Sequence, residues 1–179
     1  MRATVGFRSG ASFFGLCELK TLGWVTGELP RIHAIQASGS APVVRAFEQG
    51  LDFPEPVKPN TIAKSIAIGN PADGHHVIET LRATGGSAAM VDDDAILDTI
   101  QLLAETEGIF TEPAGGATLA GAIALIKNGA IPVDEPVVVC VTGNGYKTSD
   151  VLTGRTQTPV HLGKSLAEFE DYFKLTVAG

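Results

Sequence analysis

Aromatic residues and cysteines are both scarce in this sequence. Phe, Trp and Tyr together make up 6% of the 179 residues, so aromatic packing cannot dominate the core. The cysteines are Cys17 and Cys140, and neither belongs to a CxxC pair or to a metal-ligand spacing. This pattern excludes a disulfide framework and a cysteine zinc site. We expect both cysteines to be reduced core residues of a cytosolic protein.

An excess of positive charge and long apolar runs are also missing. The chain has 13 basic and 20 acidic side chains, a formal net charge of -7 and no run of Lys or Arg. This balance argues against nucleic acid and membrane surfaces as partners. No apolar run approaches the roughly 20 residues that span a bilayer. Residues 1–6 (MRATVG) lack the apolar core of a signal peptide, so we expect a cytoplasmic protein.

Small aliphatic residues are abundant instead, and they alternate between two kinds of pattern. Strand patterns occur at residues 31–37, 87–91, 109–111 and 137–141. Helical patterns occur at residues 13–19, 40–50, 61–68, 77–83, 92–104, 112–127 and 165–173. The length suits one domain, and the alternation predicts an α/β fold. We expect an open, mainly parallel sheet with helices on both faces and right-handed crossovers.

Several positions predict how these helices begin and pack. Ser40 precedes a proline by two residues and is expected to cap the helix that follows. Asp92 is expected to cap another helix, and Asp93 and Asp94 are better explained by the dipole of its first turn than by a cation site. The helix at 112–127 has a face of alanine and glycine. Because glycine costs about 1 kcal/mol relative to alanine inside a helix, this face implies unusually close packing.

The most informative stretch is residues 137–147, VVVCVTGNGYK. Its β-branched run does not alternate and predicts a strand buried on both faces. The turn that follows lies where open parallel sheets hold ligands. Gly143 and Gly145 let backbone amides approach a ligand closely, and Thr142 presents a hydroxyl at a fixed point. The alternative is a tight turn in which Thr142 caps the strand, because short Gly-x-Gly signals are common.

A second candidate site lies near the start of the chain. Residues 5–15 (VGFRSGASFFG) form a glycine-rich loop that feeds a helix. Unpaired amides and the helix dipole converge at such a terminus and favour phosphate, with Ser9, Gly10 and Ala11 as the expected contacts. The alternative is a disordered start of a truncated chain.

The histidines do not suggest a metal centre. No two of them are separated by four residues, and no HExxH motif or Ser/His/Asp arrangement is visible. We therefore expect structural or surface roles and no metal site. They are His33, His75, His76 and His161.

The order of the segments resembles threonine synthase, a fold-type-II enzyme that uses pyridoxal 5'-phosphate. The matching pieces are PRIHAIQASGSAPVVRAFEQG (30–50), TIAKSIAIGNP (61–71), GIFTEPAGGATLAG (108–121) and VVVCVTGNGYK (137–147). The resemblance implies the C-terminal, large-domain part of the tryptophan synthase β-like architecture. Residues 1–179 would then be a single incomplete domain, without the N-terminal half.

The resemblance also implies roles for individual residues. The threonine that faces the cofactor's pyridine nitrogen corresponds to Thr142, followed by Gly143 and Gly145. A neutral hydroxyl does not favour protonation of that nitrogen. The phosphate cradle falls on residues 5–11, which differ from the family's usual Gly- and Asn-rich run. The Schiff-base lysine belongs to the missing half, so no catalytic residue is expected here, and Lys147 belongs to the turn.

The implied reaction converts O-phosphohomoserine and water to threonine and phosphate. Another fold-type-II enzyme, such as a threonine or serine dehydratase, is the alternative within enzymes. A non-catalytic truncated homologue that serves as a binding or assembly module is the alternative of a different class. Expected partners are the small-molecule substrate and either an N-terminal half chain or a second copy of this chain.

Overall fold

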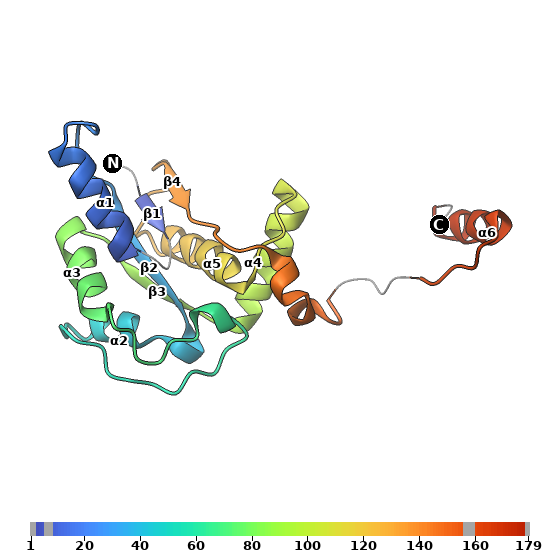
Figure 1. Cartoon of the computed structure of the whole chain (residues 1–179), viewed down its shortest axis with the longest axis horizontal. Coiled ribbons are helices and arrows are strands. Elements are labelled where there is room, and N and C mark those ends of the chain that lie inside the picture. Colours follow the sequence, from blue (N-terminus) through green and yellow to red (C-terminus); the bar gives the residue numbers. More distant parts are fainter. Residues whose placement is uncertain (1–2, 6–8, 156–159, 178–179) are drawn as a thin grey trace.

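A computed structural model describes residues 3–5, 9–155 and 160–177, with side chains described at 13–155 and 160–176 (Figure 1). The strands are β1 (Ala3–Val5), β2 (Arg31–Ala37), β3 (Ala88–Val91) and β4 (Val137–Val139). The helices are α1 (Ser9–Thr21), α2 (Pro42–Glu48), α3 (Gly74–Thr84), α4 (Asp93–Glu107), α5 (Pro113–Lys127) and α6 (Leu166–Val177). Single turns of 3-10 helix are η1 (Ser38–Ser40) and η2 (Lys64–Ile66), and η3 (Gly145–Leu152) is longer.

The described strands form one parallel sheet with the order β3-β2-β1-β4. Helix α5 crosses one face of this sheet and packs on all four strands, with α4 outside it. Helices α1, α2 and α3 pack on the other side, against β2 and β3 (Figure 1). The predicted α/β class, the parallel sheet and the helices on both faces are confirmed.

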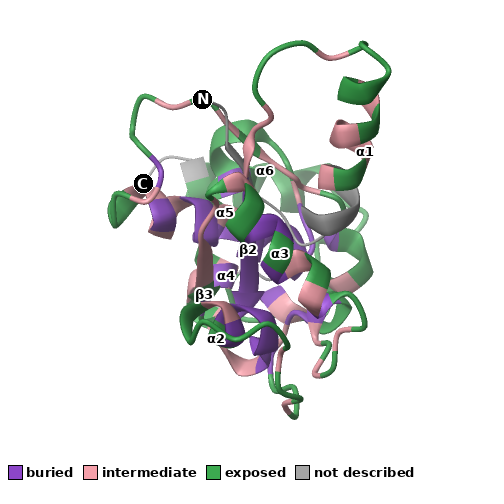
Figure 2. Cartoon of the chain, turned by 90° about the vertical axis from the view of Figure 1, so that its left-hand side faces the viewer, coloured by how far each residue is buried: buried purple, intermediate pink, exposed green. Residues whose placement is uncertain are grey.

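The main core lies between α5 and the sheet, where buried residues form a continuous layer (Figure 2). The layer is continuous because α5 lies unusually close to the sheet. A Cβ built on Gly121 would overlap the side chain of Ile35 in β2, and one on Gly116 would lie 2.7 Å from Cγ1 of Ile100 in α4. The expectation from the small-residue face is therefore confirmed.

Strand β4 differs from the prediction. The five-residue strand expected at 137–141 is a three-residue strand at the edge of the sheet. Val137 and Val139 pack against the core, whereas Val138 points to the opposite face and is 57% exposed. Burial on both faces was a wrong expectation, because the helices of the second face pack on β2 and β3 and leave β4 uncovered there.

Two other elements are shorter than expected. Residues 61–68 contain only the single turn η2 instead of a helical piece. Residues 109–111 form no strand, and Thr111 makes one isolated antiparallel bridge with Asn144. Both segments are short, so packing against neighbours decides their conformation more than local sequence pattern does.

One of the two predicted helix caps is present in the structure and the other is not. Asp92 caps α4, because its Oδ1 accepts a hydrogen bond of 2.7 Å from the amide of Ala95. Ser40 does not cap α2, since it lies in η1 and Ala41 occupies the cap position without a side-chain bond. The cap comes from β2 instead. Oε1 of Gln36 accepts from the amides of Val43 and Val44 at 2.9 and 3.0 Å.

Neither cysteine lies in the buried core. Cys17 and Cys140 are free, but both are only half-buried, so the expectation of core positions was wrong. Among the helices that the structure describes, none is long and apolar enough to cross a membrane.

His33 is fully buried in the central strand β2, where its Nδ1 accepts a 3.0 Å hydrogen bond from the amide of Ser87. Burial, and next the positive charge of Arg31, lower the pKa of His33 from 6.5 to about 4, while Glu135 opposes the shift. The unfolded chain therefore binds a proton more readily than the folded chain between these values.

Stability should be complete above about pH 6.5 and should fall as the pH drops toward 4, by an amount on the order of 3 kcal/mol for this one group. We expect His33→Asn, whose amide oxygen can still accept from Ser87, to flatten this part of the pH dependence. Urea unfolding at half-unit pH steps measures the effect. His161→Asn, in an exposed loop, is the matched control and should leave the slope unchanged; equal slopes for the two variants would contradict the assignment.

A second prediction concerns the contact between α5 and the sheet. Gly121→Ala places a methyl group against Ile35 and should destabilise the fold by roughly 1–3 kcal/mol. Gly15→Ala in α1 is the control, since a Cβ there meets no atom within 4 Å. That change should stabilise by up to about 1 kcal/mol through helix propensity. Urea midpoints compare the two, and equal midpoints would show that α5 tolerates a wider spacing.

Candidate cofactor site

The turn that follows β4 lies at the carboxyl edge of the sheet. Val139 in β4 pairs with Val5 in the parallel strand β1, so the segments that follow both strands leave at the same edge. Thr142 in this turn is exposed and makes no side-chain hydrogen bond within the described part of the chain. Its hydroxyl is therefore available to a ligand at the position where open α/β sheets bind them.

Residues 110–112, between α4 and α5, fix the backbone of this turn. The amide of Glu112 donates to the carbonyl of Gly143 at 3.1 Å, and the amide of Gly145 donates to the carbonyl of Phe110 at 3.0 Å. The hydroxyl of Thr111 also donates to the carbonyl of Gly143, at 3.0 Å. Because these bonds come from neighbouring residues of one segment, the turn is held as a rigid unit.

Close packing explains why both of these turn positions are glycine. A Cβ on Gly143 would overlap the carboxyl group of Glu112, and a Cβ on Gly145 would lie 2.5–2.6 Å from the ring of Phe110. Their role as cofactor contacts stays a prediction. The alternative in which Thr142 caps the strand finds no supporting bond in the described residues, where the side chain of Asn144 caps η3 by accepting from Tyr146 at 2.9 Å.

The predicted phosphate contacts lie at the start of α1. Ser9 begins the helix, and Gly10 and Ala11 continue its first turn. Residues 6–8 of the expected cradle lie outside the described residues, and the side chains of 9–11 are not described. The helix start follows β1 and so leaves the sheet beside the β4 turn. Phosphate binding by these three residues therefore stays a prediction.

Glu112 was missed as a site residue, although its EPAGG context was recognised as a helix start. The side chain is only 8% exposed and packs against Gly143, beside Thr142. It is the N-terminal cap position of α5, where the helix dipole favours a carboxylate. In the described part of the chain no cation pairs with it. A buried polar side chain therefore lies directly beside the candidate site.

In the described part of the chain, no side-chain hydrogen bond joins Lys147 or Lys64 to the turn after β4. Lys147 lies in η3 just after the turn and is exposed. Lys64 donates from Nζ to the carbonyl of Thr61 at 2.8 Å, within its own loop. The described residues thus fit a hydrogen bond from Thr142 to the ring nitrogen of the cofactor. Covalent attachment of the cofactor would need a group outside this arrangement.

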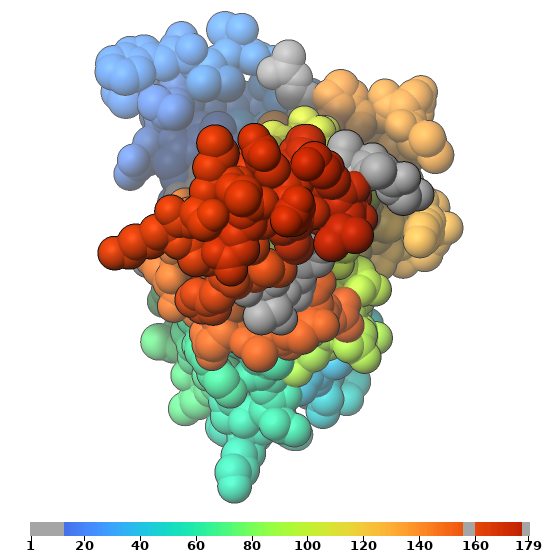
Figure 3. Space-filling model, turned by 90° about the vertical axis from the view of Figure 1, so that its right-hand side faces the viewer, coloured from blue at the N-terminus to red at the C-terminus, as the bar shows by residue number. Residues whose placement is uncertain are grey.

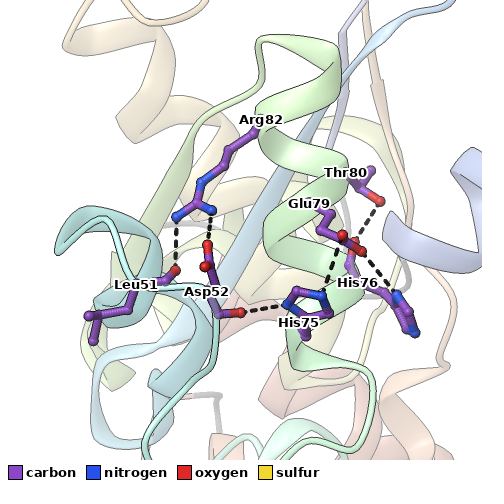
Figure 4. A network of polar contacts seen from close by, with 7 residues as sticks. All are labelled: Leu51, Asp52, His75, His76, Glu79, Thr80 and Arg82. Carbon is purple, nitrogen blue, oxygen red and sulfur yellow. Dashed lines mark hydrogen bonds and ion pairs between the residues drawn. The ribbon is translucent and has the colours of Figure 1, made fainter.

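The paired histidines form a structural network away from the turn (Figure 4). His75 Nδ1 lies 2.8 Å from the carbonyl oxygen of Asp52, and its Nε2 lies 3.4 Å from Glu79. His76 Nδ1 lies 3.2 Å from the same carboxylate, and Arg82 pairs with Asp52. These contacts tie α3 to the loop before it. No group of three or more metal-ligating side chains occurs among the residues that the structure describes.

The contact between Gly143 and Glu112 can be tested with a double-mutant cycle. Gly143→Ala should cost roughly 1–3 kcal/mol, because the new methyl group displaces a buried side chain. Glu112→Ala removes the overlapping carboxyl group, so the double variant should recover part of that loss. A coupling of at least about 0.5 kcal/mol in urea unfolding is expected for residues in contact. Simple additivity of the two changes would rule out the contact.

Comparisons with known proteins identify the family of this chain. Residues 3–143 match the model of the pyridoxal-phosphate dependent enzyme family. Threonine synthase of Methanocaldococcus jannaschii is 37% identical over 149 residues, which are 83% of this chain and 36% of that protein. Threonine synthase of Bacillus sp. is 37% identical over 162 residues, 89% of this chain and 43% of that protein. The chain therefore spans about two fifths of the length of these relatives.

Solved structures show the same fold. Threonine synthase from Escherichia coli superposes with a TM-score of 0.62 at 22% identity, over 93% of this chain and 38% of that one. Maize serine racemase superposes with a TM-score of 0.63 at 20% identity, over 86% of this chain and 45% of that one. The resemblance to threonine synthase read from the sequence is thus confirmed, and the chain belongs to the family of pyridoxal-phosphate dependent enzymes.

Proposed function

We propose that this chain is the C-terminal, cofactor-binding part of a threonine synthase, which converts O-phosphohomoserine and water to threonine and phosphate. The observation that carries the proposal is the rigid turn after β4, which presents the hydroxyl of Thr142, without a partner in the described residues, at the carboxyl edge of the sheet. The identity of 37% to two threonine synthases supports the choice of reaction. The proposed compartment is the cytoplasm.

Each part of the site has a distinct task in this proposal. Bound pyridoxal phosphate supplies an electron sink for bond changes at the substrate's carbon atoms. Thr142 positions the ring by hydrogen bonding to its nitrogen. Because a neutral hydroxyl does not favour protonation of this nitrogen, the charge of the nitrogen depends on the other groups around it. The buried carboxyl group of Glu112 is one of these groups. The amides at the start of α1 bind the cofactor's phosphate, assisted by the helix dipole.

A dehydratase that acts on serine or threonine is the competing enzyme class. An L-serine ammonia-lyase from Rhizomucor miehei superposes with a TM-score of 0.62, but at 20% identity this likeness concerns the fold alone. The sequence identity of 36–40% is to threonine synthases. We therefore propose the synthase reaction.

The resemblance places the Schiff-base lysine in the N-terminal half of the family's fold, and β4 leaves a surface that this half can cover. Val138 is exposed on the uncovered side of β4, and β4 is the last strand of the described sheet. An apolar side chain on an unpaired edge strand is typical of a surface that another segment covers. The occupant we propose is the N-terminal half of a threonine synthase. A second copy of this chain is the alternative.

The function is tested by adding the N-terminal part of a threonine synthase to this chain and measuring phosphate release from O-phosphohomoserine. Each polypeptide alone should release no phosphate, and this chain alone should give no visible absorbance of a lysine-linked cofactor. The mixture should release phosphate and should show the visible absorbance of a lysine-linked cofactor. Phosphate release by this chain alone would reassign the anchoring role to Lys147, and deamination of threonine by the mixture would favour the dehydratase. Tight association without either reaction would favour a non-catalytic binding module.

In the active mixture, Thr142→Val should weaken cofactor retention and lower turnover by roughly ten- to a hundredfold. A lost hydrogen bond to a buried group costs about 1–3 kcal/mol, and about 1.4 kcal/mol corresponds to tenfold. Thr142→Ser should restore most of the loss. Thr106→Val is the control, because this threonine lies on α4 and bonds only to the carbonyl of Leu102. Normal retention and turnover in Thr142→Val would return the turn to a purely structural role.

A further inference from the structure

Helix α6 carries an exposed aromatic stripe. Leu166, Phe169 and Phe173 are spaced three and four residues apart and therefore share one face of the helix. Their exposed fractions are 72%, 50% and 53%, and the rings of Phe169 and Phe173 stack with centroids 6.0 Å apart. We call these three residues the α6 stripe. Nothing in the described part of the chain covers it.

Such a helix needs a partner surface. Helix α6 has 12 residues, and isolated helices shorter than about 12–15 residues are marginally stable in water. Most helical stability in proteins comes from burying an apolar face, and contiguous exposed apolar side chains usually mark an interaction site. The length and the stripe of α6 together imply a docking surface within its reach.

An apolar cleft of about 540 Å³ lies between α4 and η3. Its apolar walls come from Ile100 and Ala104 on one face of α4, from Leu152 in η3 and from Phe110. Gln101, Glu105 and Arg155 line it as well. We call it the α4 cleft. Its apolar lining and its size suit two or three large apolar side chains.

Two ion pairs, which we call the clamp, lie on the rim of the cleft. Arg155 pairs with Asp94 at 2.9 Å and also with Asp98, and both carboxylates project from α4. The clamp links the residues that follow η3 to α4. The walls are therefore positioned before any ligand or segment enters.

The chain itself leads from this rim to α6. Arg155 is the last residue of the clamp, and residues 156–165 separate it from the first residue of α6. Ten residues reach at most about 35 Å, which is enough to return a helix to the cleft where its tether begins. Figures 1 and 3 agree that α6 lies on the side of the molecule where η3 emerges.

We propose that α6 folds back and buries the α6 stripe in the α4 cleft of its own chain. The closed form covers three exposed apolar side chains and fills an apolar cleft in one step. It also connects to the candidate site, because Phe110 lines the cleft and packs edge-on against Tyr146, with ring centroids 5.2 Å apart, directly after Gly145. Docked α6 supports the segment that holds the turn.

Hydrogen–deuterium exchange of the full chain tests this closure. Amides of α6 should exchange at least tenfold more slowly in the parent than in the double variant Phe169→Asp, Phe173→Asp. Leu175→Asp is the matched control, since Leu175 lies on the opposite face of α6 and is already exposed. That control should retain slow exchange.

A variant in the cleft wall identifies the docking surface. Ala104→Asp should accelerate exchange of α6 as the stripe variants do, while Leu102→Asp, on α4 but outside the cleft, should not. Slow exchange of α5 in the same samples shows that each variant is folded. Two results would overturn the proposal: fast exchange of α6 in the parent, or protection that appears only at concentrations where the chain dimerises, which would assign the helix to a second copy. Protection of α6 that survives Ala104→Asp would also reject this cleft.

Discussion

The close packing of α5 on the sheet is the contact on which the rest of this structure depends. Gly121 brings the α5 backbone against Ile35, and Gly116 brings it against α4. The hydroxyl of Thr99 in α4 donates to the carbonyl of Gly116 at 2.8 Å, so the same spot also carries a buried hydrogen bond between the two helices. Because no side chain separates α5 from its neighbours at Gly116 and Gly121, the sheet and α4 fix the position of the helix and of both its ends.

The candidate site inherits its geometry from that packing. The segment before α5 carries Phe110, Thr111 and Glu112, and its hydrogen bonds hold the turn after β4. The glycines of the turn accept this segment at a spacing that a Cβ would prevent. Thr142 is thus aimed by a contact between two loops, each fixed by an element of the core. A site built in this way needs no long strand, which explains how the three-residue β4 can support it.

Sequence reasoning succeeded where the signal is local and failed where a distant residue decides. The cap formed by Asp92 and the extent of α5 follow from spacing within one helix, and both agree with the structure. The cap of α2 could not be read locally, because Gln36 reaches it from the preceding strand. The edge position of β4 depends on which helices cover the second face of the sheet. The role of Glu112 depends on Gly143, which lies 31 residues further along the chain.

The exposed residues around β4 and the turn have a common physical meaning. Val138 is exposed on the side of β4 that faces away from the core. Thr142 lies in the turn that follows β4 and has no side-chain partner in the described residues. A cofactor held by one hydroxyl and one helix start would be bound from one side only and would remain hydrated on the other. Water competes with each of these hydrogen bonds, so their strength depends on exclusion of solvent. In the proposed function, the surface that covers Val138 also determines how tightly Thr142 can hold a ring, so the apolar edge and the polar site would act as parts of one interface.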